Sequence, residues 1–408
     1  MPSTSERDTQ GDAPALNASE SRRALSAFLL FGVLTSALGA FLPAWGYHLK
    51  PDLTVAANFF LCFNAGLLIA VRTAFILLPR KGIAYSLVLA SSLACGAFVL
   101  LAITSYGSPS FIAIGLLVLG FSAGLLNAAV FHAISPLYFH DRAATTTLAG
   151  TLYGLGCFLT ALLVAGTYYV YSVRVILILF AVIPGLFIVI FARARFSNAG
   201  IVQEVPLRHV LEEFKNPGAV LFALILFFQF GNEWSIAGWL PIFLIRRLGI
   251  SPAASLFMLA FYWGSLLVGR VTAKALLKSV HHGKLLLASI VMALLGCVIL
   301  SYTPNRFGAN AGILLIGCGF APIYPLVVEK IGHRFTYYHP GLYNGIFSFA
   351  FTGGLLAPFM LGYLAQEFGV GAIMTMPMLG VFMVFVLALL ILLETKLSGD
   401  VHVTRARA

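Results

Sequence analysis

The sequence predicts an all-α membrane protein with twelve transmembrane helices in two pseudo-symmetric six-helix halves. Three observations predict it: the composition, the spacing of the apolar runs and an internal repeat. Of the 408 residues, 60% are hydrophobic and 10% are charged, whereas soluble domains carry about 25% charged residues. Because a bilayer offers no water to backbone N–H and C=O groups, such apolar runs should form helices.

Twelve apolar runs follow one another along the chain, and each is long enough for a transmembrane helix of about 20 residues. They cover residues 24–49, 53–78, 83–105, 111–139, 146–171, 174–194, 219–245, 253–278, 284–303, 309–333, 342–366 and 370–394. Turn-forming clusters such as Lys50-Pro51-Asp52 and Pro79-Arg80-Lys81-Gly82 separate them.

The longest polar connection inside the chain divides these runs six and six. It covers residues 195–218, between a first half at 24–194 and a second half at 219–395. Residues 1–23 are polar and lack the apolar segment of a signal peptide, so we expect a disordered cytoplasmic tail. Residues 396–408 are expected to form a second cytoplasmic tail.

Basic residues indicate the orientation, because they concentrate in cytoplasmic connections. With the N-terminus inside, only five of the 25 basic residues lie on the outer side, and the other 20 lie on the inner side. The outer five are Lys50, Arg174, Arg246, Arg247 and Arg306. We therefore expect a multi-pass protein of the plasma membrane with both termini in the cytoplasm.

The two halves repeat one another at a constant offset of 198 residues. The matches include Pro43 with Pro241, Gly66 with Gly264, Arg72 with Arg270, and Gly156 with Gly354. Two related halves with a site between them at mid-membrane are typical of proteins that work by alternating access.

Other classes of protein find no support in the sequence. The five cysteines all lie in apolar runs, which favours packing roles. No nucleotide-binding loop, metal-ligand spacing or nucleophile–base arrangement is evident, so we expect no cofactor, no metal and no enzymatic activity. Because topology explains the basic residues, we expect no nucleic-acid partner. We expect the protein to be a monomer in a lipid bilayer.

A single carboxylate marks the candidate site. Glu233 is at position 15 of the 27 residues in the run 219–245. A charge at the centre of a bilayer is expensive, so an acid there is a functional candidate by default. We expect Glu233 to bind solute and to be the group that carries a coupled proton. The alternative is a structural acid that never titrates.

Amides and aromatic rings at similar depth complete the predicted site. Asn64, Asn127, Gln229 and Asn232 both donate and accept hydrogen bonds, which suits sugar hydroxyls. They could equally join helices together. The aromatic candidates, which could stack on the apolar face of a pyranose or simply pack, are Trp239, Trp263, Tyr262 and Tyr324.

The repeat, the long central connection and the Gly…Arg sequences that lead into the loops between spans 2 and 3 and between spans 8 and 9 resemble the major facilitator superfamily. Within it, three segments of the second half are similar to the fucose-permease-like sugar transporters. They are Glu233-Trp-Ser-Ile-Ala-Gly-Trp-Leu-Pro241, Tyr262-Trp-Gly-Ser-Leu-Leu-Val-Gly-Arg270 and Gly319-Phe-Ala-Pro-Ile-Tyr-Pro325. The resemblance implies the major facilitator fold and a sugar as solute.

Two departures concern coupling. The first helix carries no acid, and Asn127 is the nearest polar residue to the acid that fucose permeases place in their fourth helix. Glu233 would replace those acids. We therefore expect proton-coupled transport of a small polar solute, most simply a sugar. A sugar uniporter, an efflux transporter with a cavity rich in Phe and Met, and a non-transporting receptor on the same fold are the alternatives.

Overall fold

The structure, a computed structural model, describes residues 18–140, 142–194, 196, 212, 214–277, 279–335 and 345–405. Over these residues the longer elements are eleven α-helices. They are α1 (Ala18–Ala44), α2 (Thr54–Thr104), α3 (Pro109–His140), α4 (Arg142–Thr167), α5 (Val173–Ala192), α7 (Pro217–Leu248), α8 (Pro252–Leu276), α9 (His282–Tyr302), α10 (Arg306–Arg334), α11 (Gly345–Phe368) and α12 (Ala372–Arg405). Each contains a stretch long and apolar enough to cross a membrane.

Helix α2 contains two of the predicted spans. Its 51 residues would extend about 77 Å at 1.5 Å per residue, more than twice the roughly 30 Å of a bilayer core. Gly82 interrupts it with φ 83° and ψ 173°, a conformation open to glycine but not to residues with a Cβ. The described helices therefore accommodate all twelve predicted spans.

The terminal helices extend further than predicted. Helix α1 begins at Ala18, inside the stretch expected to be a disordered tail, and α12 continues to Arg405, beyond the expected end of the last span. The described apolar spans themselves begin at Arg23 and end at Glu394. The first 17 residues and most of the predicted 195–218 linker lie outside the described residues.

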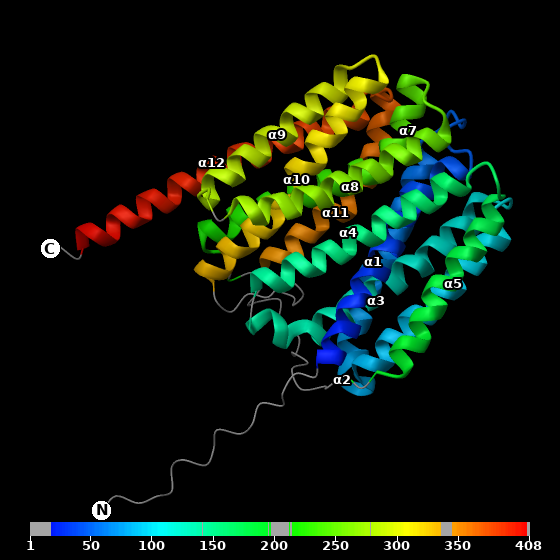
Figure 1. Cartoon of the computed structure of the whole chain (residues 1–408), viewed down its shortest axis with the longest axis horizontal. Coiled ribbons are helices and arrows are strands. Elements are labelled where there is room, and N and C mark those ends of the chain that lie inside the picture. Colours follow the sequence, from blue (N-terminus) through cyan, green and yellow to red (C-terminus); the bar gives the residue numbers. More distant parts are fainter. Residues whose placement is uncertain are drawn as a thin grey trace, which may run out of the picture.

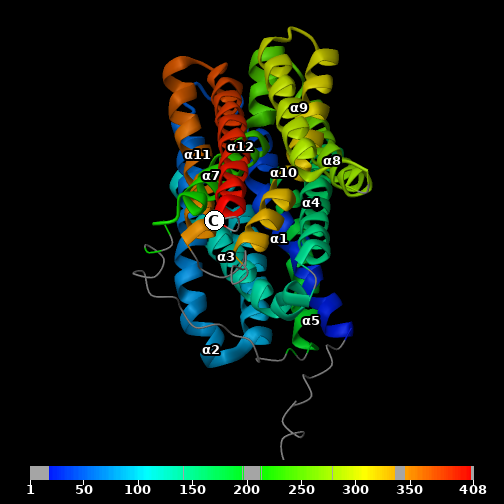
Figure 2. The ribbon, with the colours of Figure 1, turned by 90° about the vertical axis from the view of Figure 1, so that its left-hand side faces the viewer.

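The helices form two groups that meet along a common boundary. Helices α1–α5 pack on one another, as do α7–α12, and the groups meet through the pairs α4–α8, α2–α11 and α1–α7. In Figure 1 the first group (blue to green) lies below the second (light green to red). Figure 2 shows α9–α12 in the upper part of the molecule, α2, α3 and α5 in the lower part, and α1 and α4 between them.

Both described chain ends lie at one end of this bundle, which we call the termini end (Figure 1). The last residues of α3, α8 and α10 and the first residues of α4, α9 and α11 lie there too. The connections between α1 and α2, α4 and α5, and α7 and α8 lie at the opposite end, which we call the far end.

Glycines allow the same close helix contact in both groups. A Cβ at Gly156 of α4 would overlap the carbonyl oxygen of Leu29 in α1, and a Cβ at Gly353 of α11 would overlap that of Phe227 in α7. Leu29 and Phe227 are separated by the repeat offset of 198. The fifth span of each half thus packs on the first in the same way, backbone against backbone.

Candidate solute-binding site

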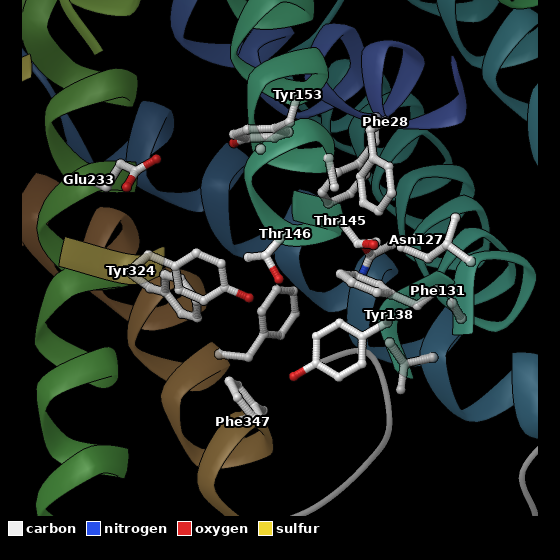
Figure 3. Close-up of a pocket in the computed structure, with 18 of the residues that line it drawn as sticks. Phe28, Asn127, Phe131, Tyr138, Thr145, Thr146, Tyr153, Glu233, Tyr324 and Phe347 are labelled. Atoms are coloured by element: carbon white, nitrogen blue, oxygen red, sulfur yellow. The ribbon is translucent and has the colours of Figure 1, made fainter. Parts of the chain in front are cut away.

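A cavity of about 220 Å³ lies between the two groups of helices. Tyr138 and Thr145 beside the α3–α4 connection and Phe347 in the first turn of α11 line it, so it extends towards the termini end (Figure 3). Its lining comes from α1, α2, α3 and α4 of the first group and from α7, α8, α10 and α11 of the second. Each half thus contributes its first, second, fourth and fifth span.

Glu233 projects into this cavity from α7. Its side chain is 7% exposed, and it is the only acid that lines the cavity among the described residues. In Figure 3 its carboxyl group and the hydroxyl group of Tyr153 point towards one another from α7 and α4. The predicted mid-membrane acid therefore faces the boundary between the halves.

Arg270 supplies the opposite charge. It lines the cavity from α8, is 9% exposed, and lies within electrostatic range of Glu233. One guanidinium nitrogen, Nη1, donates a hydrogen bond to the carbonyl oxygen of Gly150 in α4, across the boundary. A Cβ at Gly150 would lie 3.3 Å from the guanidinium, and one at Gly154 would lie 3.1 Å from it, so these glycines make room for the arginine.

Sequence reasoning missed this role of Arg270, which it placed among the basic residues of the inner membrane surface. The available signal was its position, because α8 continues six residues past it to Leu276 within an apolar run. The cavity consequently holds one positive and one negative side chain rather than a lone acid.

Asn127 and Tyr324 also line the cavity, as predicted residues of the site. Asn127 comes from α3, and Tyr324 lies on α10, where its hydroxyl group points into the cavity beside Thr146 in Figure 3. Aromatic side chains make up much of the remaining wall. They are Phe28, Phe31, Phe131, Tyr138, Tyr153, Phe230, Trp234, Phe347 and Phe351.

A second cavity of about 30 Å³ adjoins the first. It is lined by two further predicted residues, Asn64 of α2 and Trp263 of α8, and by Thr35 and Ser36 of α1. Tyr153 and Trp234 line both cavities, so these two rings separate them.

The structure places the other four predicted residues outside both cavities. They are Gln229, Asn232, Trp239 and Tyr262. Asn232 faces Gly380 of α12, and Trp239 donates its indole N–H to the carbonyl oxygen of Pro358 over 2.8 Å. Gln229 lies on the same helix within reach of the carboxyl group of Glu233, and the hydroxyl of Tyr262 is buried without a hydrogen-bond partner among the described residues.

Polar contacts join the halves at the far end. Arg246 at the end of α7 donates to the carbonyl oxygens of Tyr47, His48 and Lys50, at 3.3 Å and 3.1 Å for the first two. Arg246 thus holds the connection that follows α1 to the other half. Burial, together with the charge of Arg246, lowers the pKa of His48, which favours the neutral imidazole beside the guanidinium.

Two more contacts reinforce this end. Gln366 of α11 accepts the backbone N–H of Leu53 at 2.8 Å, and Tyr363 donates to Asn58 at 2.9 Å. At the termini end, ion pairs join helices of the second half. His282 Nε2 lies 3.1 Å from Glu329 Oε1. The guanidinium group of Arg334 forms a bidentate ion pair with the carboxylate of Glu394, with N···O distances of 2.6 and 2.7 Å.

The chain matches a protein-family model over most of this fold. Residues 24–358 match the model described as Major Facilitator Superfamily. The match reaches into both groups of helices and includes every residue that lines the two cavities.

Curated relatives match over a shorter stretch. A glucose/galactose transporter of Brucella abortus biovar 1 (strain 9-941) is 27% identical over 162 residues, 39% of each chain. The glucose/mannose transporter GlcP of Bacillus subtilis (strain 168) is 24% identical over 35% of each chain. Membrane protein MosC of Rhizobium meliloti is 21% identical over 40% of each. The matched stretch is therefore well under half the length of these relatives.

Solved structures share the fold along nearly the whole chain. A D-xylose–proton symporter superimposes with a TM-score of 0.72 at 15% identity, covering 91% of this chain and 96% of that one. The nucleoside transporter NupG gives 0.68 at 15% identity, with 92% and 99% covered. The E. coli fucose–proton symporter FucP gives 0.60 at 15% identity, with 91% and 98% covered.

Proposed function

Because this chain belongs to the major facilitator superfamily, we propose that it is a secondary active transporter of a sugar, which couples sugar movement to protons through Glu233. The observation that carries the proposal is the cavity between the halves. It brings a buried acid, a buried arginine, an amide and several aromatic rings to one place.

The chemistry of the cavity supports a sugar. Asn127, Thr145 and Thr146 offer donors and acceptors for hydroxyl groups, and the rings around them offer apolar faces for a pyranose. The paired charges of Glu233 and Arg270 leave the lining without net charge, which suits a neutral solute. The volume of about 220 Å³ is below the roughly 300–1,000 Å³ of sites for drug-sized ligands. The names of the curated relatives point to hexoses.

The placement of Glu233 supports proton coupling. When Glu233 is ionised, its negative charge offsets the positive charge of Arg270. When Glu233 takes up a proton, the cavity at the boundary between the halves gains one net positive charge. Arg270 binds Gly150 across the same boundary. The protonation of Glu233 can therefore alter the contact between α8 and α4, and a proton and a sugar would meet in one cavity.

The distribution of basic residues supports an orientation with both termini in the cytoplasm of a plasma-membrane transporter. In that orientation the cavity extends towards the cytoplasm, and the contacts of Arg246, Gln366 and Tyr363 hold the outer side together. Alternating access requires these outer contacts to break while the α4–α8 boundary closes.

Efflux of amphipathic compounds is the second candidate, because six phenylalanines line the cavity: Phe28, Phe31, Phe131, Phe230, Phe347 and Phe351. It predicts binding of lipophilic cations and little response to hexoses. Sugar transport predicts the reverse.

A counterflow panel in proteoliposomes tests the proposal. Vesicles loaded with unlabelled glucose, galactose, mannose, xylose or fucose are diluted into the labelled sugar, with lipophilic cations as a parallel set. We expect transient accumulation with at least one sugar. Accumulation with none of them, in protein that remains monodisperse and folded, would contradict sugar transport.

A further inference from the structure

The small cavity has polar side chains in its wall, which distinguishes it from a packing defect. Its walls come from both halves, through Thr35, Ser36 and Asn64 on one side and Trp263 and Pro358 on the other. Its volume of about 30 Å³ exceeds the roughly 10–15 Å³ that a cavity needs to hold one water molecule. A water molecule or a ligand hydroxyl group therefore fits in it.

One strong donor in its wall has no protein partner. Trp263 is 1% exposed, and its indole N–H makes no hydrogen bond within the described part of the chain. Because a buried donor without an acceptor is unfavourable, this N–H is suited to a ligand oxygen. Trp239 shows the alternative, since its indole N–H is bound by the carbonyl oxygen of Pro358.

Acceptors stand in the same wall. The hydroxyl of Ser36 donates to the carbonyl oxygen of Gly32 at 2.7 Å, and that of Thr35 donates to the carbonyl oxygen of Phe31 at 3.0 Å. Both hydroxyl oxygens retain lone pairs. The amide nitrogen of Asn64 donates to the carbonyl oxygen of Leu355, which fixes the amide orientation and leaves its oxygen as an acceptor. A ligand hydroxyl, which both accepts and donates, matches this set.

Tyr153 stands at the boundary between the two cavities, because it lines both of them. Its ring lies edge-on to that of Trp263 with centroids 5.9 Å apart. Its hydroxyl is 3.5 Å from that of Thr35, at the long limit for a hydrogen bond. A ligand that occupies both cavities at once requires this ring to move aside.

We propose that the small cavity is a subsite for one sugar hydroxyl, with the indole N–H of Trp263 as the donor and Ser36 and Asn64 as acceptors. The proposal rests on the sugar function given above and assigns to Trp263 the choice among sugars that differ at one hydroxyl. It differs from a stacking role, because a stacking ring would serve any pyranose.

Binding of a deoxy-sugar series tests it. The parent hexose and its single-deoxy analogues are titrated against wild type and Trp263→Phe, which keeps an aromatic ring and removes the N–H. We expect Trp263→Phe to bind the parent about tenfold more weakly, the loss of roughly one hydrogen bond. For one analogue the substitution should make no difference, because that analogue lacks the hydroxyl that the N–H serves.

Two further variants make the result specific. Tyr262→Phe removes a buried hydroxyl next to Trp263 that lines neither cavity, and it should leave every affinity unchanged. Ser36→Ala, a smaller change, should show the same analogue selectivity as Trp263→Phe if the latter folds poorly. Equal weakening of all sugars by Trp263→Phe and Ser36→Ala would overturn the subsite.

A density map of the substrate-free wild type separates this proposal from the sugar function. A solvent-filled subsite should show an ordered water within hydrogen-bond distance of the Trp263 indole nitrogen. If no sugar binds but this water is present, the sugar function fails while the hydroxyl site stands. A dry cavity at this position would overturn the subsite whichever solutes the protein binds.

Discussion

Glu233 and Arg270 are opposite charges buried in one cavity, and each acts electrostatically on the other. Removing one of two buried opposite charges leaves the other uncompensated, whereas removing both can be nearly neutral. The hydrogen bond from Arg270 to Gly150 satisfies only part of the guanidinium. The two residues that we propose to act in transport should therefore also affect the stability of the fold.

The first prediction concerns coupling. Glu233→Gln keeps the size and hydrogen-bonding capacity of the side chain but cannot exchange a proton. We expect this variant to catalyse exchange of sugar between equal pools, because the cavity is intact. Uptake of sugar against its own concentration gradient, driven in proteoliposomes by an outside pH below the inside pH, should be lost.

Retained uphill uptake by Glu233→Gln would show that another group carries the proton. A wild type that never responds to a pH difference would indicate a uniporter, with Glu233 serving only as a solute ligand.

The second prediction concerns stability. Arg270→Gln should lower the free energy of unfolding by about 1–3 kcal/mol, because it removes the positive charge that acts on the buried carboxyl group of Glu233. Adding Glu233→Gln should restore most of this loss, and the double-variant cycle should show a coupling energy above about 1 kcal/mol. Unfolding in detergent, followed by tryptophan fluorescence, measures these differences. Additive effects would mean that the two charges do not interact.

A site residue has two coordinates: its depth in the membrane and its direction about the helix axis. The sequence could identify only the residues for which depth was sufficient. Depth is readable, because Glu233, Asn127 and Tyr324 stand at mid-span, and these three line the cavity. Rotation is not readable, because α7 is apolar on nearly every side and carries no periodic signal. Asn232 therefore seemed equivalent to Glu233, although it faces α12.

At the scale of helices, backbone contact at glycines determines how closely the spans approach. Gly156 and Gly353 touch carbonyl oxygens of α1 and α7, and neither contact leaves space for a methyl group. The offset of 198 indicated a repeated feature at Gly156 and Gly354, yet the tight contact in the second half is at Gly353. Sequence alignment of a repeat thus finds the helix pair but leaves the contact uncertain by one residue.

The third prediction uses these glycines. Gly156→Ala and Gly353→Ala should each lower the free energy of unfolding by about 1–3 kcal/mol, as overpacked sites do. Gly166→Ala is the matched control on α4, because a Cβ there meets nothing within 4 Å, and it should be neutral or slightly stabilising. Melting temperatures in one detergent compare the three. Equal shifts for all of them would argue against close packing.

The fourth prediction concerns the link between α7 and the end of α1. Arg246→Gln removes the cation that binds three carbonyl groups of the other half. We expect the far end to open more often. A spin-label pair across that end, one label on each half, should show a larger population at long distance.

Arg247 provides the control, because it binds the carbonyl oxygen of Ser301 inside its own half. Arg247→Gln should leave the distance distribution unchanged. If both variants behave alike, the effect of Arg246 comes from a general loss of charge rather than from the link between halves.

At the scale of the whole molecule, the cavity and the contacts at the far end describe one state of an alternating-access cycle. The halves are tied together at the far end by Arg246, Gln366 and Tyr363, while the cavity extends towards the termini end. Composition and spacing were sufficient to predict the spans, because membrane insertion imposes them on each segment separately. They could not predict this state, since it depends on contacts between halves.

The last prediction assigns the two ends to the two sides of the membrane. Cysteines are introduced singly at Thr4, Gly200 and Gly399 in a chain whose five native cysteines are replaced. The excess of basic residues in the connections on their side predicts that an impermeant thiol reagent labels them only after the cells are opened. Gly107, in the far-end connection between α2 and α3, is the control position and should be labelled in intact cells.

This result also fixes the direction in which the cavity faces. If the three terminal-side cysteines are protected and Gly107 is labelled, the cavity extends towards the cytoplasm and Arg246 lies on the outer side. An external acid pulse would then reach Glu233 only after the far-end contacts break, which makes their breaking an obligatory step of proton-coupled uptake. Labelling of any terminal-side position in intact cells would reverse the orientation, and the same structure would describe a cavity that faces outwards.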